Sequence, residues 1–159
     1  MATLFQGKDH AQVYAQSRPS TPPELISRVL NFLREQYTGD LHLAVDVGCG
    51  SGQNTFLFSE HFENVIGTDV SGAQIEVATT SRNDKPNVTF AVHPSHEIPA
   101  MDGSVELITA ATAAHWFDLP KFFAEGDRVL RQNGVMALYS YNMFPRLNFV
   151  DENGIDKSD

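Results

Sequence analysis

The sequence predicts a doubly wound α/β fold, in which one parallel sheet of order 3-2-1-4-5 carries helices on both faces. Five apolar runs alternate with helical segments, and this alternation implies parallel pairing through right-handed crossovers. The runs at 105–110 and 135–138 are nearly all apolar, as strands buried on both faces should be. A glycine-rich loop follows the first run, where such folds place a ligand. The 159 residues suit one domain, expected over 1–150, with an acidic flexible tail at 151–159.

The first expected element is a helix from residue 21 to about residue 37. Thr21 and Glu24 are spaced as a capping box, and Pro22 suits the first helical position. Apolar residues then recur at helical spacing, and Gly39-Asp40 ends the pattern. We therefore expect an amphipathic helix that packs one face on the sheet.

The remaining elements alternate along the chain. Ser71 and Gln74 form a second candidate capping box, Asp118 can cap the last helix, and Asn133-Gly134 is expected to end that helix in a turn with positive φ. The expected strands are 42–47, 64–69, 87–92, 105–110 and 134–141, and the expected helices are roughly 53–61, 72–82 and 119–131.

Composition narrows the classes of partner. The formal charge of −9 and the lack of any Lys/Arg run argue against nucleic acid and membranes as partners. The single cysteine, Cys49, excludes an intramolecular disulfide and fits a reducing compartment, so a cytoplasmic location is expected. His93 and His96 lack a partner set at metal-ligand spacing, and no metal site is predicted.

The sharpest feature is the glycine loop at residues 46–52, Asp-Val-Gly-Cys-Gly-Ser-Gly. Gly48 permits a tight turn, Gly50 lets the backbone approach a ligand, and Gly52 lets the following helix pack closely. The spacing is GxGxG, whereas a dinucleotide-binding loop would place its third glycine at Gln53. A turn with only a packing role is the alternative interpretation of the loop alone.

Asp69 strengthens the binding interpretation. It ends the second expected strand, 21 positions after Gly48, where a carboxylate can accept hydrogen bonds from both ribose hydroxyls of a nucleoside. An ordinary solvated aspartate is the alternative, but the pairing with the loop favours a nucleoside ligand.

Together these residues resemble the class I S-adenosylmethionine-dependent methyltransferases, transferases with a Rossmann-like fold and a methyltransferase type 11 domain. Residues 46–52 match the first motif of the family, Asp69 matches the second, and residues 98–109 and 128–134 are similar to two later motifs. Tyr14, Arg18 and Pro19 resemble a small-molecule branch, the trans-aconitate methyltransferase-like proteins. The resemblance runs from about residue 10 to 145.

The resemblance implies S-adenosyl-L-methionine as cofactor. Loop N–H groups would hold its methionine carboxylate, Asp69 its ribose, and Asp46 its amine through water. Pro94 stands where many members have an acidic residue near the adenine, so the Ser95 hydroxyl or nearby backbone groups would serve there instead. The implied cofactor-binding positions are Tyr14, Asp46, Gly48, Gly50, Gly52, Asp69, Val70, Ser95, His96 and Thr112.

A small-molecule acceptor is implied as well, with a carboxylate as one candidate. Arg18 could pair with such a carboxylate, and a solvated loop arginine is the equal alternative. His115 is the candidate acid or base and Trp116 a candidate wall of the acceptor pocket; a merely packed histidine is the alternative for His115.

The family fold has seven strands, and the last two have no counterpart in this sequence. We therefore expect a C-terminally truncated methyltransferase domain whose fifth strand, 134–141, forms an exposed sheet edge and promotes self-association. Two alternative functions remain: a nucleotide-dependent oxidoreductase, which would need GxGxxG, and a non-catalytic form that retains at most donor binding.

Overall fold

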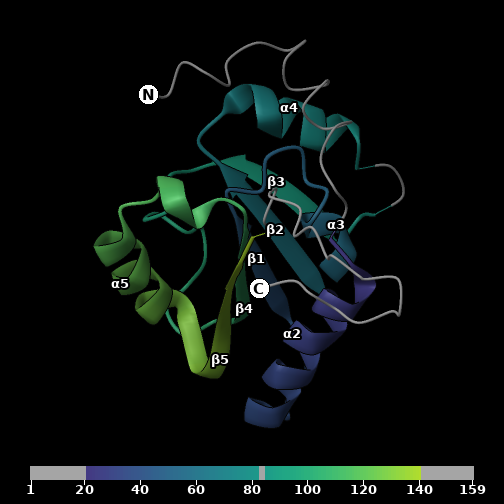
Figure 1. The fold of residues 1–159 in the computed structure, drawn as a ribbon, viewed down its shortest axis with the longest axis vertical. Coiled ribbons are helices and arrows are strands. Elements are labelled where there is room, and N and C mark those ends of the chain that lie inside the picture. The colour runs from purple at the N-terminus through teal and green to yellow at the C-terminus, as the bar shows by residue number, and fades with distance from the viewer. Residues whose placement is uncertain (1–20, 83–84, 141–159) are drawn as a thin grey trace, which may run out of the picture.

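The computed structural model describes residues 21–82 and 85–140. Tyr14, Arg18, Tyr141 and the predicted tail at 151–159 lie outside these residues. The described chain forms a five-stranded, fully parallel sheet of order β3-β2-β1-β4-β5, which confirms the predicted topology (Figure 1). The strands are β1 Leu43–Val47, β2 Asn64–Asp69, β3 Val88–Val92, β4 Val105–Ala111 and β5 Leu130–Tyr139.

Helices cover both faces of the sheet. The structure has α2 Pro23–Gln36, α3 Thr55–Phe58, α4 Gly72–Thr80, α5 Leu119–Val129 and a single 3-10 turn, η2, at Ala114–Trp116. In Figure 1, α2 and α5 lie on opposite sides of the strands. None of the helices in the described ranges is long and apolar enough to span a bilayer.

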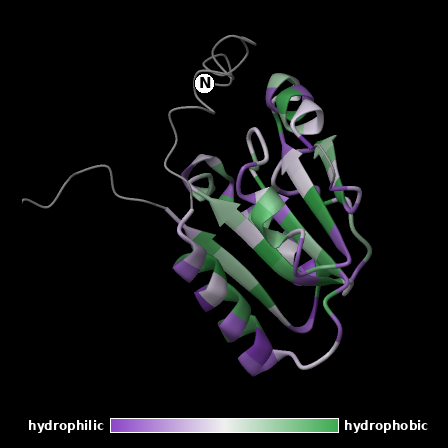
Figure 2. Ribbon diagram, turned by 90° about the vertical axis from the view of Figure 1, so that its right-hand side faces the viewer, coloured by the Kyte–Doolittle hydropathy of each residue, from purple (hydrophilic) through white to green (hydrophobic). Residues whose placement is uncertain are grey.

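Two apolar cores lie on the two faces of the sheet because successive strand residues point to opposite sides. On β4, Leu107 joins the core beneath α2, while its neighbour Ile108 joins the core beneath α5. Leu33 of α2 and Phe122 of α5 are both fully buried. Figure 2 shows the consequence: the strands are mostly hydrophobic, and α2 is hydrophilic along much of its outer side.

The start of α2 differs from the prediction. Pro22 occupies the cap position, and no side chain caps the helix. Thr21 instead donates a hydrogen bond of 3.4 Å from its Oγ1 to Asn54 Oδ1. Pro23 disfavours a helical conformation in the residue before it, so Pro22 is extended, with ψ of 139°, and the helix starts at Pro23.

The helix after the glycine loop is also shorter than predicted. Only residues 55–58 are helical, with turns on both sides, whereas a helix over 53–61 was expected. The loop therefore leads into one helical turn rather than a helix long enough to carry a useful dipole.

The end of α5 is the largest difference. The helix ends at Val129, and Asn133-Gly134 lies inside β5 rather than at the helix end. Asn133 does have a positive φ of 65°, but it belongs to a bulge: Val105 pairs with Leu130, and Leu107 already pairs with Val135. A turn signal at the right positions was thus assigned to the wrong element.

Candidate functional site

The candidate site lies at the carboxyl ends of β1, β2 and β4, where a doubly wound sheet binds its ligands. The loop of residues 48–52 follows β1, Asp69 ends β2, and Thr112 follows β4. Thr112 has a positive φ of 56°, a conformation that costs energy for a threonine, and its N–H donates to Tyr139 O at 2.7 Å. The topology therefore brings the predicted glycine loop, Asp69 and Thr112 to one edge.

Two of the loop glycines are required by packing. All three have positive φ, but a Cβ at Gly48 would lie 2.5 Å from Ala113 Cβ. A Cβ at Gly52 would lie 2.7 Å from the ring of Phe90 on β3 and 3.3 Å from Ala78 Cβ on α4. Gly52 thus permits close packing, but of β3 and α4 against the loop rather than of the following helix against the strand, as was predicted.

Gly50 differs from Gly48 and Gly52, because the space that a side chain would enter at position 50 is open among the described residues. Among described residues, a Cβ there would meet only Gln74 Oε1, at 3.8 Å. Its N–H donates to Asp69 Oδ2 at 2.9 Å, and Asp69 Oδ1 accepts from Ser71 N at 2.8 Å. Asp69 is half-buried, and each of its oxygens keeps acceptor capacity for a further partner. Gly50 and Asp69 therefore form a cradle that a side chain at position 50 would occupy.

The expected use of the loop N–H groups needs correction. Gly48 N and Cys49 N donate to Thr68 O at 2.8 and 2.9 Å, and Gly52 N donates to Cys49 O at 3.0 Å. With Gly50 N bonded to Asp69, four N–H groups of the loop are already satisfied within the protein. These four groups shape the loop, and they are not available to hold a carboxylate or a phosphate.

Asp46 does not face the cradle. It is 1% exposed, and its carboxylate accepts from Thr55 Oγ1 at 2.7 Å, Thr109 Oγ1 at 2.8 Å and Asn54 Nδ2 at 2.9 Å. Burial raises the pKa of Asp46, while the bonds from Thr55, Thr109 and Asn54 lower it. These contacts tie the residues after the glycine loop to β1 and β4.

The network extends to the last described strand. Tyr139 Oη donates to Asn54 Oδ1 at 2.7 Å, and burial raises the pKa of Tyr139 well above its usual range. The residues predicted from the sequence did not include Asn54, Thr55, Thr109 or Tyr139. Asn54 and Thr55 could have been suspected from their place just after the loop, but no local pattern marks Thr109 or Tyr139.

The other predicted site residues lie in the segments that follow β2, β3 and β4. Ser95 is buried and His96 half-buried in the loop after β3, and Val70, next to Asp69, is 67% exposed. His115 and Trp116 form part of η2 after β4, with ring centroids 5.0 Å apart, and Trp116 is 59% exposed. Within the described ranges no group of three or more His, Cys, Asp or Glu residues is placed to hold a metal ion.

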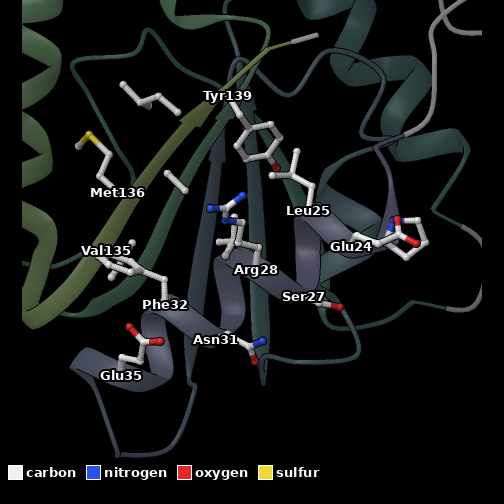
Figure 3. Close-up of a pocket in the computed structure, with 14 residues that line it drawn as sticks. Glu24, Leu25, Ser27, Arg28, Asn31, Phe32, Glu35, Val135, Met136 and Tyr139 are labelled. Atoms are coloured by element: carbon white, nitrogen blue, oxygen red, sulfur yellow. The ribbon is translucent and has the colours of Figure 1, made fainter. Parts of the chain in front are cut away.

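A groove of about 890 Å³ lies away from the glycine loop, between α2 and β5 (Figure 3). Leu25 and Phe32 approach it from α2, and Val135 and Tyr139 approach it from β5. The groove follows β5, which is the end strand of the described sheet. It therefore concerns the sheet edge rather than the cradle.

Comparison with known proteins gives consistent matches. A family model described as a methyltransferase domain matches residues 45–138, more than half of the chain. A Dictyostelium discoideum protein described as a methyltransferase is 38% identical over 138 residues, which cover 87% of this chain and 49% of that protein. CRG1 of Saccharomyces cerevisiae, a probable S-adenosylmethionine-dependent methyltransferase, is 30% identical over 80% of this chain and 44% of its own length.

Solved structures agree with these matches. A structure from Anaeromyxobacter dehalogenans, described as a type II methyltransferase, has a TM-score of 0.66 and 38% identity. The similarity covers 84% of this chain and 52% of that one. The chain thus spans about half the length of the relatives it matches.

Proposed function

Because the chain belongs to the methyltransferase domain family, we propose that it binds S-adenosylmethionine at the Gly50–Asp69 cradle for methyl transfer to a small-molecule acceptor. The observation that carries the proposal is the open side of Gly50 next to a carboxylate with spare acceptor capacity. When bound, the cofactor supplies an electrophilic sulfonium methyl group. The protein supplies alignment, which is the main requirement for a displacement between two bound reactants.

The charges around the cradle fit a cationic donor. Asp46 and Asp69 lie near the ends of the neighbouring strands β1 and β2. After burial, the negative charge of Asp69 further raises the pKa of Asp46. The half-buried carboxylate of Asp69 attracts a sulfonium or an ammonium group and repels a pyrophosphate. Four N–H groups of the loop, that of Gly50 included, are already bonded within the protein, so these four are not available to a pyrophosphate. Both points favour the donor over a dinucleotide.

Four of the predicted residues receive roles within this proposal. Asp69 accepts from the ribose, and Asp46 acts indirectly, by fixing Asn54 and Thr55 behind the loop. Val70 and Ser95 flank the space expected for the adenine, where Val70 offers an exposed apolar surface.

The second ligand of the proposal is the methyl acceptor. His115 and Trp116 follow β4 and face the same edge of the sheet as Asp69, so we place the acceptor beside η2. A carboxylate acceptor would need no general base, and in that case His115 orients it while Arg18 pairs with its charge.

Isothermal titration calorimetry with S-adenosylhomocysteine, S-adenosylmethionine and NAD tests the proposal. We expect binding of both adenosyl ligands and no binding of NAD. Incubation with labelled S-adenosylmethionine and a set of small carboxylates then tests transfer. Binding without transfer would favour a non-catalytic donor-binding protein, and no binding of either adenosyl ligand would overturn the proposal.

A further inference from the structure

Gln74 has an unusual environment for a buried amide. It lies in the first turn of α4 and is 4% exposed, yet its Oε1 has no hydrogen-bond partner within the part of the chain that the structure describes. The predicted capping box is only half formed: Gln74 N donates to Ser71 Oγ at 3.4 Å, and the side-chain oxygen does not complete it. A buried acceptor without a partner costs free energy, so a partner is expected in some state of the protein.

The position of this oxygen indicates where such a partner would come from. Gln74 Oε1 is the nearest described atom to the open side of Gly50, 3.8 Å from where a Cβ would stand. The same glycine is bonded through its N–H to Asp69 Oδ2. The orphaned oxygen therefore borders the cradle on the side where a ligand would lie against Gly50.

We propose that Gln74 is a further donor-binding residue, whose Oε1 accepts a hydrogen bond from a ribose hydroxyl of the bound nucleoside. This inference rests on the proposed function, because it assigns one more contact to the same ligand. An amide oxygen can only accept, and the ribose is the donor-rich part of the ligand expected beside Asp69. Gln74 would share the ribose with Asp69, and ligand binding would satisfy an acceptor that the free protein leaves unsatisfied.

The other orphaned buried oxygen provides a matched control. Thr68 Oγ1 also lacks a partner among the described residues, and Thr68 is 1% exposed on β2. Its backbone oxygen supports the glycine loop, and a valine would leave that oxygen in place. Thr68→Val therefore removes an unsatisfied polar atom without removing the proposed ligand contact.

The test compares Gln74→Met, Gln74→Glu and Thr68→Val by calorimetry with S-adenosylhomocysteine and by the melting temperature of the ligand-free protein. We expect Gln74→Met to bind roughly 3- to 10-fold more weakly, as for the loss of one neutral hydrogen bond. Its ligand-free melting temperature should be equal to or above that of the wild type. Gln74→Glu, which keeps an acceptor oxygen, should bind better than Gln74→Met, and Thr68→Val should bind within about twofold of the wild type.

The 2′-deoxy and 3′-deoxy analogues of S-adenosylhomocysteine separate a direct contact from a structural effect. The wild type should lose affinity for both analogues, and Gln74→Met should lose clearly less than the wild type for one of them. Equal losses in the two proteins, or a lower melting temperature with unchanged affinity, would overturn the inference while leaving the proposed function intact. A wild type that binds no adenosyl ligand would instead overturn the proposed function itself.

Discussion

Asp69 is the residue whose removal should most directly weaken ligand binding. Asp69→Ala removes a charged acceptor for the ribose and also the partner of Gly50 N. Hydrogen bonds to charged groups contribute about 1.5–3 kcal/mol each, so affinity for S-adenosylhomocysteine should fall by at least roughly tenfold. Calorimetry measures this directly, with Asp102→Ala as control, since Asp102 is an exposed acid paired with Arg128. Unchanged affinity in a folded Asp69→Ala protein would show that Asp69 has only a structural role.

Gly50 and Gly52 should separate binding from folding. Gly50→Val places a side chain in the cradle, where no described atom lies closer than 3.8 Å, and the left-handed conformation costs about 1–2 kcal/mol. Gly52→Val drives a side chain into the ring of Phe90 and should lower the melting temperature far more. Circular dichroism and calorimetry on both variants test this contrast. Parallel losses of melting temperature and affinity in Gly50→Val would make Gly50 a packing residue like Gly52.

The roles of single residues were predictable only where they depend on local sequence. The need for glycine at positions 48, 50 and 52 could be predicted from their spacing, since all three have positive φ in a loop that directly follows a strand in the chain. The burial of Asp46 could not be predicted in this way, because its partner Thr109 lies 63 positions away in the sequence. The use of the loop N–H groups was mispredicted for the same reason: Gly48 N and Cys49 N donate to Thr68 O on another strand, and Gly50 N donates to Asp69 at the end of that strand.

At the scale of elements, the bulge in β5 allows one ion pair that should stabilise the sheet. Glu106 on β4 is fully buried, accepts from Leu43 N at 2.7 Å and pairs with Arg131, which lies in the bulge. Arg131→Met would leave the Glu106 charge buried without its partner, which costs roughly 3–5 kcal/mol for a fully buried pair. We expect the low end of that range because Arg131 is 32% exposed.

Urea unfolding measures this loss of stability. Lys121→Met serves as control, since it removes an exposed pair with Asp118 and should cost less than about 1 kcal/mol. Equal changes in the two variants would show that Glu106 is stabilised without Arg131.

The order of the elements followed from the sequence, whereas their ends did not. Alternating apolar runs and helices predict the parallel order, since few other arrangements satisfy right-handed crossovers. The turn signal Asn133-Gly134 was real, but a positive φ suits both a helix end and a strand bulge. Only the pairing of Leu130 with Val105 decides between them, and that contact is not encoded locally.

At the scale of the whole molecule, the outer edge of β5 should favour self-association. This strand ends the described sheet, and Leu138 beside the α2 groove is 39% exposed. Unpaired backbone groups and an apolar surface invite pairing with a second copy. Leu138→Lys should therefore lower the apparent molecular mass measured by light scattering at high protein concentration.

Leu119→Lys is the matched control, because Leu119 on α5 is also 39% exposed but is not among the residues that line the groove beside β5. It should leave the apparent mass unchanged. A wild type that stays monomeric at all concentrations would contradict the edge argument.

The polar network behind the glycine loop also has a consequence for the order of folding. Tyr139 and Asn54 are 85 positions apart, and a ribosome releases Asn54 well before Tyr139. A nascent chain that ends before β5 already contains Asp46 and Thr109, the partners of Asn54 on β1 and β4, but it lacks the hydroxyl group of Tyr139. The network behind the glycine loop therefore receives its last partner only near the end of synthesis, when most of the sheet has already been made.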